Sequence, residues 1–489
     1  MFPWTLHCPS CSEPYALDAG LFACPGAPAG GEHILQRVLA AGSSTAEDLR
    51  ASWGRGGGTF ERLSPLLSAR RLAGAAGYGP ILLRVSAELA QHEGRAFEVT
   101  PLTAAPALAA AIGRPGPLWV KDETGNVTGS HKGRHLMGTL LYLEALRCLD
   151  PARPRRALAI YSCGNAALAA AAVARAGGCE LHAFVPADVD PVVDRMLAER
   201  GAIVEKIPRA ATGTGDPCYL AFRSALAGNG WLPFACAGND NWSNIEGGAT
   251  LGWELVLQLA EQGEGVDHVV VQVGGGALAR AAAQAFEEAH RLGLLVRLPR
   301  IHVCQPEGGF PFVRAWLLAL AEIARRSGRS FDLRYDRAAD PWVQLQRALG
   351  FCRAHTDQIQ EIAGYACRSF DSPAVQSVLT HMAGEAGHFM WPWDGPAPQS
   401  LAHGILDDVT YDWYHLLRAV LRTGGRAEIL DEGTIGRAHG LAQRHTGIRV
   451  CATGAAGLAG LIRLTATGVI DPGASAAVLF TGFDRSQGR

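Results

Sequence analysis

Lysine is nearly absent from this sequence. Of its 44 basic residues only three are lysines, namely Lys121, Lys132 and Lys206, and the others are arginines. Arginine can supply charge and hydrogen bonds, but only an amine can condense with a carbonyl to form a Schiff base. A catalytic amine therefore has very few possible positions. Lys132 is the main candidate, because it directly follows a loop of polar residues and glycine.

Other absences narrow the class of protein further. The net charge is -2 at pH 7 and there is no basic tail, which argues against nucleic acid and anionic membrane as partners. No apolar run is long enough to span a bilayer, and the first residues lack the layout of a signal peptide. We therefore expect a cytoplasmic protein whose 12 cysteines are reduced thiols.

Three of these cysteines form an incomplete metal-binding pattern near the start of the chain. Cys8 and Cys11 have the spacing of two thiolates on one zinc ion, and Cys24 could supply a third ligand. The nearby candidates for a fourth ligand are His7 and His33. The alternative is a ribbon that has lost its metal, so the sequence leaves the presence of a metal open.

Apolar strands alternate with helical segments over most of the remaining chain. Because 489 residues are too many for one ordinary core, two domains with appendages are expected. The alternation predicts an α/β fold with largely parallel sheets covered on both faces. The strands are predicted at 118–120, 157–161, 180–185, 269–273 and 476–480.

Four of these strands are followed directly by polar or glycine-rich motifs, at 121–130, 162–165, 274–276 and 481–482. In open parallel sheets, ligands bind beyond the carboxyl ends of the strands. The shared position of the motifs therefore predicts a single site. The glycines offer backbone N–H groups at a helix start, which suits a phosphate group. The run is not G-x-G-x-x-G, so a phosphate cup combined with Lys132 indicates pyridoxal phosphate rather than a dinucleotide.

Several motifs resemble those of fold-type-II pyridoxal-phosphate enzymes, and they follow one another in the same order as in that family. Within the family, they most resemble the threonine synthase-like branch. The resemblance runs from about Thr59 to the end of the chain, apart from an inserted segment. It implies two parallel-sheet α/β domains with the cofactor in the cleft between them. The motifs that carry it lie at 100–102, 120–123, 126–132, 162–165, 244–247, 273–278, 453–456 and 479–482.

The resemblance also implies roles for single residues. Lys132 would form the Schiff base with pyridoxal 5'-phosphate and later shuttle the Cα proton of the substrate. Asn165 would bind the pyridine O3′, and the Thr481 hydroxyl would meet the pyridine nitrogen. A neutral hydroxyl leaves that nitrogen largely unprotonated, which favours expulsion of a β or γ substituent over transamination.

Anion-binding roles are implied as well. The cofactor phosphate would be held by the backbone amides of Gly274, Gly275, Gly276 and Ala277. The substrate carboxylate would be bound at the start of a helix by Ser162, Cys163, Gly164 and Asn165. His131 is similar to a histidine of the tryptophan synthase β subunit that contacts the cofactor phosphate; a solvent-facing position at the helix start is the alternative.

The expected domain limits follow from the same comparison. Residues 1–35 form a cysteine-containing, ribbon-like segment. Residues 36–130 and 246–489 form the large cofactor-binding domain, which includes an inserted helical cap at 307–400. Residues 131–245 form a smaller α/β domain.

The expected protein is a pyridoxal-phosphate-dependent carbon–oxygen lyase or β/γ-replacement enzyme. We expect it to act on an α-amino acid as its small-molecule substrate and to form a homodimer. Threonine synthase-like γ-elimination with rehydration, dehydratase or ammonia-lyase chemistry, and β-replacement all remain open. The alternatives from other classes are a Rossmann-like nucleotide-binding protein and a non-catalytic binding protein. His403 could reach the substrate or could be a buried polar residue.

Overall fold

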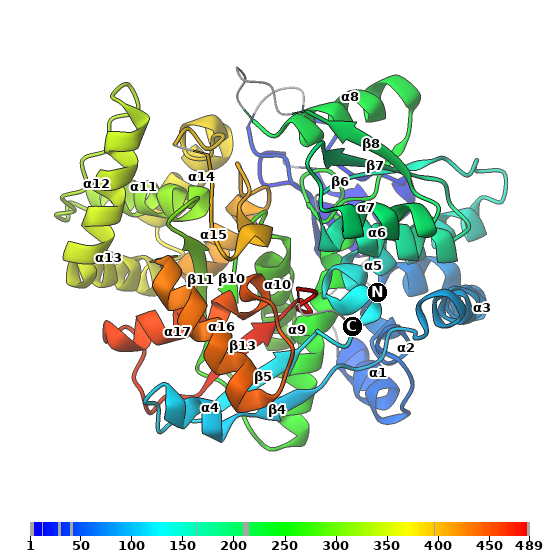
Figure 1. The fold of residues 1–489 in the computed structure, drawn as a ribbon, viewed down its shortest axis with the longest axis horizontal. Helices are drawn as coiled ribbons and strands as arrows, with labels where there is room; N and C mark the ends of the chain where they lie inside the picture. Colours follow the sequence, from blue (N-terminus) through cyan, green and yellow to red (C-terminus); the bar gives the residue numbers. More distant parts are fainter. Residues whose placement is uncertain are drawn as a thin grey trace.

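Two mostly parallel sheets and a small antiparallel ribbon form the framework of the computed structural model (Figure 1). The structure describes residues 4–11, 13–27, 31–39, 43–162, 164–208, 215–395 and 397–486. Within this part of the chain, no helix is long and apolar enough to cross a membrane. The predicted α/β class is confirmed.

The larger sheet has six strands in the order β12-β11-β10-β13-β5-β4. The first five run parallel, and β4 pairs antiparallel with β5. Every residue of β10, β12 and β13 is buried, as expected for a parallel sheet covered on both faces. The strands are β4 (Leu102–Ala104), β5 (Leu118–Asp122), β10 (His268–Gln272), β11 (Arg300–Pro306), β12 (Ala427–Leu430) and β13 (Ala476–Phe480).

The smaller sheet is entirely parallel and has the order β8-β7-β6-β9. Its strands are β6 (Leu158–Tyr161), β7 (Leu181–Pro186), β8 (Ile203–Ile207) and β9 (Leu232–Pro233). The helices of this half, at the right of Figure 1, are α3 (Ser68–Glu93), α5 (Lys132–Leu149), α6 (Asn165–Ala176), α7 (Pro191–Glu199) and α8 (Pro217–Asn229).

The long helix α9 (Ser243–Glu261) joins the two halves, because it packs against both α5 and α10 (Ala277–Arg291). A Cβ atom at Gly138 of α5 would collide with the backbone of Gly247 in α9. The two helices therefore approach each other as closely as glycine permits. This contact fixes α5, which carries Lys132 at its start, against the centre of the molecule.

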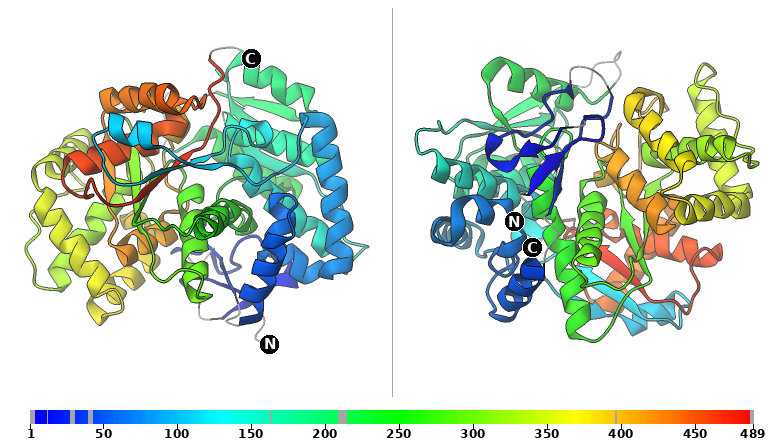
Figure 2. Two further views of the ribbon diagram at one scale, coloured as in Figure 1. Left: turned by 90° about the horizontal axis from the view of Figure 1, so that it is seen from below. Right: turned by 180° about the vertical axis from the view of Figure 1, so that it is seen from behind.

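The antiparallel ribbon has the order β2-β1-β3 and lies on the back of the molecule, dark blue in the right-hand view of Figure 2. Its strands are β1 (Thr5–His7), β2 (Tyr15–Ala16) and β3 (Gln36–Val38), with the short helix η1 (Leu17–Ala19) between the last two. The further helices of the two halves are α1 (Ser43–Gly54), α2 (Thr59–Arg62), α4 (Pro106–Ala111), α15 (Trp413–Thr423), α16 (Glu432–Thr446) and α17 (Ala452–Ala466).

The segment predicted as an inserted cap contains α11 (Pro311–Arg326), α12 (Pro341–Ala354), α13 (Thr356–Arg368) and α14 (Pro373–Gly384). These helices pack against edge strand β12 and helix α15. In Figure 1 they lie on the left, on the opposite side of the six-stranded sheet from the four-stranded sheet. Residues 385–412 then lead from the insertion back to the glycine loop after β10.

All five predicted strands are present, but five short or more polar strands of the two larger sheets were missed, and the three strands of the ribbon were not predicted individually. The missed strands are β4, β8, β9, β11 and β12. Arg300–Pro306 (β11) carries an arginine and a histidine, and β9 has only two residues, so neither shows an apolar run. The exact domain limits stay a prediction.

Candidate active site

The three lysines lie in different environments. Lys206 is exposed and forms an ion pair with Asp194 at 2.6 Å. Lys121 is fully buried, and its amine contacts Glu254 at 2.6 Å. Lys132 is partly buried at the start of α5, and no described residue accepts a hydrogen bond from its amine or forms an ion pair with it. Of the three amines, only that of Lys132 is open to a ligand.

Four buried charges support the start of α5. Arg134 donates hydrogen bonds to both carboxylate oxygens of Glu123, at 2.7 and 2.8 Å, and to both of Glu254, at 2.8 and 3.0 Å. Glu254 also accepts a hydrogen bond from Lys121. Burial alone would raise the pKa of Glu254, but Arg134 and Lys121 outweigh it and lower the pKa to about 2. The balanced network ties α5 to β5 and α9.

The loop before Lys132 is held in one conformation. The Asn126 side chain accepts a hydrogen bond from the next backbone amide at 2.8 Å. Thr128 has φ of 60°, and in the described part of the chain it is the one non-glycine residue with positive φ. Ser130 forms an isolated β-bridge with Gly482, beyond the end of β13. A constrained backbone of this kind is typical of functional sites.

His131 is buried, so its solvent-facing alternative is wrong. Its Nδ1 atom lies 3.2 Å from the carbonyl oxygen of Thr481, whereas its Nε2 atom has no hydrogen-bond partner in the described part of the chain. Burial, and next the charge of Lys132, lower the pKa of His131 well below its ordinary value. The ring is therefore neutral, and Nε2 is left for a bound group.

Thr481 follows β13 and is buried. Its hydroxyl oxygen accepts a hydrogen bond from Gln272 Nε2 at 2.7 Å, and the same amide lies 3.0 Å from Gly454 O. Because the Thr481 oxygen is the acceptor, its hydroxyl hydrogen remains for another acceptor. Gln272 was missed, although a polar residue at the end of an apolar strand and before a glycine run is a usable signal.

The glycine loop lies between β10 and α10, as predicted. Gly276 has φ of 94°, a conformation that favours glycine. A Cβ atom at Gly274 would collide with the carboxylate of Asp407, and one at Gly275 would lie 3.6 Å from the same oxygen atom. The loop therefore already lies against a carboxylate. Burial raises the pKa of Asp407 to about 6, and the charge of Lys132 limits this rise.

Asn165 is the first residue of α6. Its Oδ1 atom accepts a hydrogen bond from Arg485 at 2.5 Å, and Arg485 also contacts Thr128 O at 2.5 Å. A Cβ atom at Gly482 would lie 3.2 Å from Asn165 Nδ2, so the amide faces the segment after β13. Arg485 was missed, because only folding brings this late residue to α6.

The predicted carboxylate-binding loop is described in part. The Gly164 amide donates a hydrogen bond to Ser162 Oγ at 3.3 Å, and Cys163 lies outside the described residues.

His403 is exposed in η6 (His403–Ile405), so its interpretation as a buried polar residue is wrong.

Several predicted site residues lie near one another. His131 contacts Thr481, Gln272 at the end of β10 also contacts Thr481, and Asn165 lies beside Gly482. Asp407 lies against the glycine loop, and the charge of Lys132 limits the rise in the pKa of Asp407. The carboxyl ends of β5, β10 and β13 and the start of α6 thus contribute to one place. No such contact in the described part of the chain joins His403 to this set.

Comparisons with known proteins agree with this geometry. A sequence model of the family described as "Pyridoxal-phosphate dependent enzyme" matches residues 95–362, more than half of the chain. A threonine synthase from Synechocystis sp. is 29% identical over 215 residues, which are 44% of this chain and 52% of the relative. A threonine synthase from Mycobacterium leprae is 32% identical over 219 residues, 44% of this chain and 55% of the relative. The chain thus spans about half the length of these curated relatives.

The fold of the chain is also similar to that of solved structures. A threonine deaminase from T.th. has a TM-score of 0.52 and 20% sequence identity, over 83% of this chain and 98% of that one. The serine racemase of maize has a TM-score of 0.53 and 16% identity, over 83% of this chain and 94% of that one. These likenesses confirm the predicted fold-type-II architecture.

Proposed function

Because the chain belongs to the family of pyridoxal-phosphate dependent enzymes, we propose that it is a lyase or synthase that acts on an α-amino acid. It would remove the Cα proton and then expel or replace a β or γ substituent. Both matched curated relatives are threonine synthases, which supports this class of reaction. The family also makes pyridoxal phosphate the cofactor, so the Rossmann-like nucleotide-binding alternative is set aside.

Three features of the site fit this cofactor. The amine of Lys132 has no hydrogen-bond or ion-pair partner among the described residues, as a Schiff-base lysine requires. His131 Nε2 is buried and unpaired in the same part of the chain. The carboxylate of Asp407 lies against the glycine loop, which supports the proposal that the amides of this loop bind an anion.

The residues that would hold the cofactor follow from these contacts. The amides of the glycine loop would bind its phosphate, Thr481 would face its ring nitrogen, and Asn165 would face its ring hydroxyl. When bound, pyridoxal phosphate supplies an electron sink for the pair of electrons left at Cα.

The chain's own residues would prepare and carry out the proton transfer. Gln272 orients the Thr481 hydroxyl by donating to its oxygen. The buried network of Arg134 and Glu254 fixes the start of α5 and thus the position of Lys132. Lys132 Nζ would accept the Cα proton and return it, while the start of α6 would bind the substrate carboxylate through its backbone amides.

The main observation behind this proposal is that the amine of Lys132 has no hydrogen-bond or ion-pair partner among the described residues. Borohydride reduction of the protein with pyridoxal phosphate should label Lys132 alone, as read by peptide mass spectrometry. Lys121→Arg and Lys206→Arg are the matched controls and should keep the label, whereas Lys132→Arg should lose it. A label on Lys121 or Lys206 would contradict the assignment.

The reaction class is tested separately with amino acids that carry β or γ leaving groups. In deuterated water, good substrates should exchange their Cα hydrogen, as followed by NMR, and Lys132→Ala should abolish the exchange. Turnover without exchange, or with release of carbon dioxide, would point to a different reaction. The homodimer and the cytoplasmic location stay predictions.

A further inference from the structure

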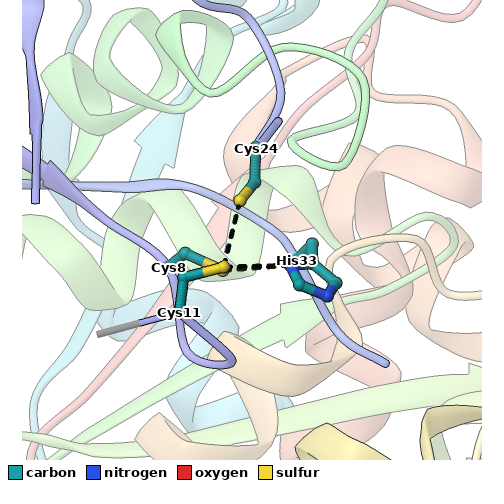
Figure 3. A group of neighbouring side chains, drawn as sticks. All are labelled: Cys8, Cys11, Cys24 and His33. Atoms are coloured by element: carbon teal, nitrogen blue, oxygen red, sulfur yellow. Dashed lines mark hydrogen bonds between the residues drawn. The ribbon is translucent and has the colours of Figure 1, made fainter. Parts of the chain in front are cut away.

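The ribbon at the start of the chain carries a second cluster of chemically active side chains (Figure 3). Cys8 and Cys11 lie in and after the turn that follows β1, and Cys24 and His33 come from the segment between η1 and β3. Their four potential ligand atoms all lie within 4.8 Å of one another. None of these residues has a part in the proposed reaction.

The separations match those of ligands around one small ion. Cys11 Sγ lies 3.5 Å from Cys24 Sγ and 3.5 Å from His33 Nδ1, and Cys8 Sγ lies 3.4 Å from the same nitrogen. Sulfur at about 2.3 Å and nitrogen at about 2.1 Å from a tetrahedral zinc ion are about 3.6 Å apart. All four side chains therefore point at a common centre of the right size.

The cluster lies largely away from solvent, and the backbone approaches it closely. Cys8 and Cys24 are buried, and Cys11 and His33 are partly buried. The Gly26 amide donates a hydrogen bond to Cys24 Sγ at 3.4 Å, which suits a thiolate, and a Cβ atom at Gly26 would lie 2.9 Å from Cys11 Sγ. Glycine at this position thus lets the backbone approach the sulfur atoms.

A second hydrogen bond fixes the two ligand segments relative to each other. Ser10, between the first two cysteines, donates from its hydroxyl to Glu32 O at 2.6 Å, directly before His33. His7, the other histidine considered from the sequence, is exposed and contacts Thr5 at 2.9 Å. The fold therefore selects His33 over His7.

We propose that Cys8, Cys11, Cys24 and His33 bind one zinc ion. Three thiolates and one imidazole complete a four-coordinate shell, which leaves no open position for a reacting water or substrate. The site is therefore structural. The proposal does not depend on the reaction proposed above.

The position of the site explains what the ion would stabilise. Arg37 of β3 donates hydrogen bonds to Glu246 of α9 at 2.5 Å and to Glu288 of α10 at 2.9 Å, and all three side chains are buried. Backbone carbonyls of the ribbon also accept hydrogen bonds from Trp242 at 2.8 Å and from Arg280 at 2.7 Å. Loss of the ion should therefore weaken the packing of α9 and α10 as well as the ribbon.

The test is the metal content of the whole protein, purified under reducing conditions and measured by inductively coupled plasma mass spectrometry. We expect one equivalent of zinc per chain, lost in His33→Ala and in Cys11→Ala. His7→Ala and Cys148→Ala are the matched controls and should retain it, since Cys148 is exposed on α5. Removal of zinc with a chelator should lower the melting temperature of the wild type.

A second set of measurements distinguishes loss of a metal ligand from failure of a variant to fold. His33→Cys supplies a fourth thiolate and should keep the metal. Cobalt exchanged into the wild type should give the intense visible bands of a tetrahedral site with thiolate-to-metal charge transfer, and these bands should shift in His33→Cys. A folded, reduced wild type that takes up neither zinc nor cobalt would overturn the proposal, as would loss of zinc in His7→Ala.

Discussion

The carboxylate of Asp407 lies directly against the glycine loop, because a Cβ atom at Gly274 would collide with its Oδ2 atom and one at Gly275 would lie 3.6 Å from it. Burial raises the pKa of Asp407 to about 6, against the opposing effects of Lys132 and the Gly275 amide. The side chain is therefore ionised above this pH and neutral below it. A phosphate group at the amides of this loop would meet a like charge only above about pH 6.

Asp407→Asn should therefore bind pyridoxal phosphate more tightly than the wild type well above pH 6. We expect roughly a fivefold gain in affinity, since one like charge at close range is worth about 1 kcal/mol at high dielectric. The gain should shrink below pH 6, where the wild-type carboxyl is protonated. Fluorescence titration of apo-protein measures both affinities.

Asp371→Asn is the control for the Asp407 variant, because Asp371 is an exposed carboxylate on the insertion. It should bind the cofactor like the wild type at every pH. If Asp407→Asn also matches the wild type on both sides of pH 6, the Asp407 carboxylate does not oppose the phosphate.

The lysines should differ sharply in their effects on stability. Lys121→Ala removes one of the two cations that pair with the buried carboxylate of Glu254. This change should lower the free energy of unfolding by about 3–5 kcal/mol. Lys206→Ala breaks an exposed pair with Asp194 and should cost less than about 1 kcal/mol. Urea denaturation followed by circular dichroism compares the two. Equal midpoints would mean that the buried network contributes little.

The sequence predicted the centre of the fold because the central strands are buried on both faces. The strands at 269–273 and 476–480 read as plain apolar runs, and each is followed by a motif at its carboxyl end. The edges were harder to predict. Ile203–Ile207 (β8) is a partly exposed edge strand with two charged residues, so its hydrophobic signal is weak.

The parts of the site that were missed depend on contacts between distant segments. Asp407 reaches the glycine loop from a stretch that follows a long insertion, and Arg485 reaches Asn165 across 320 positions. The sequence did name His33 beside His7 as a candidate fourth ligand of the cysteine cluster, but only the fold of the ribbon brings His33 to the three cysteines. No spacing rule contains this information. A residue such as Gln272, next to a predicted motif, was within reach of sequence reasoning.

Gly275→Asp should abolish retention of the cofactor. The new carboxylate would project toward Tyr411, whose ring lies 3.2 Å from the position that a Cβ atom would take, and would add a second anion beside Asp407. Gly265→Asp is a matched control, because Gly265 is exposed and has open space around it. Equilibrium dialysis with pyridoxal phosphate should show binding only in the control. A folded Gly275→Asp protein that binds normally would move the phosphate site elsewhere.

Substitution of Thr481 tests the proposed preference for elimination over transamination. Gln272 donates to its hydroxyl oxygen, so the hydroxyl can in turn donate to the cofactor's ring nitrogen. Thr481→Asp would instead offer a carboxylate, which favours a protonated ring nitrogen and a stronger electron sink. We expect a larger share of side transamination relative to elimination, measured as the ratio of the two products, and an altered visible spectrum. Thr481→Ser keeps the hydroxyl and should behave like the wild type. If the product ratio and spectrum of Thr481→Asp also match the wild type, Thr481 does not contact the ring, and the preference for elimination must arise from the groups that bind the substrate.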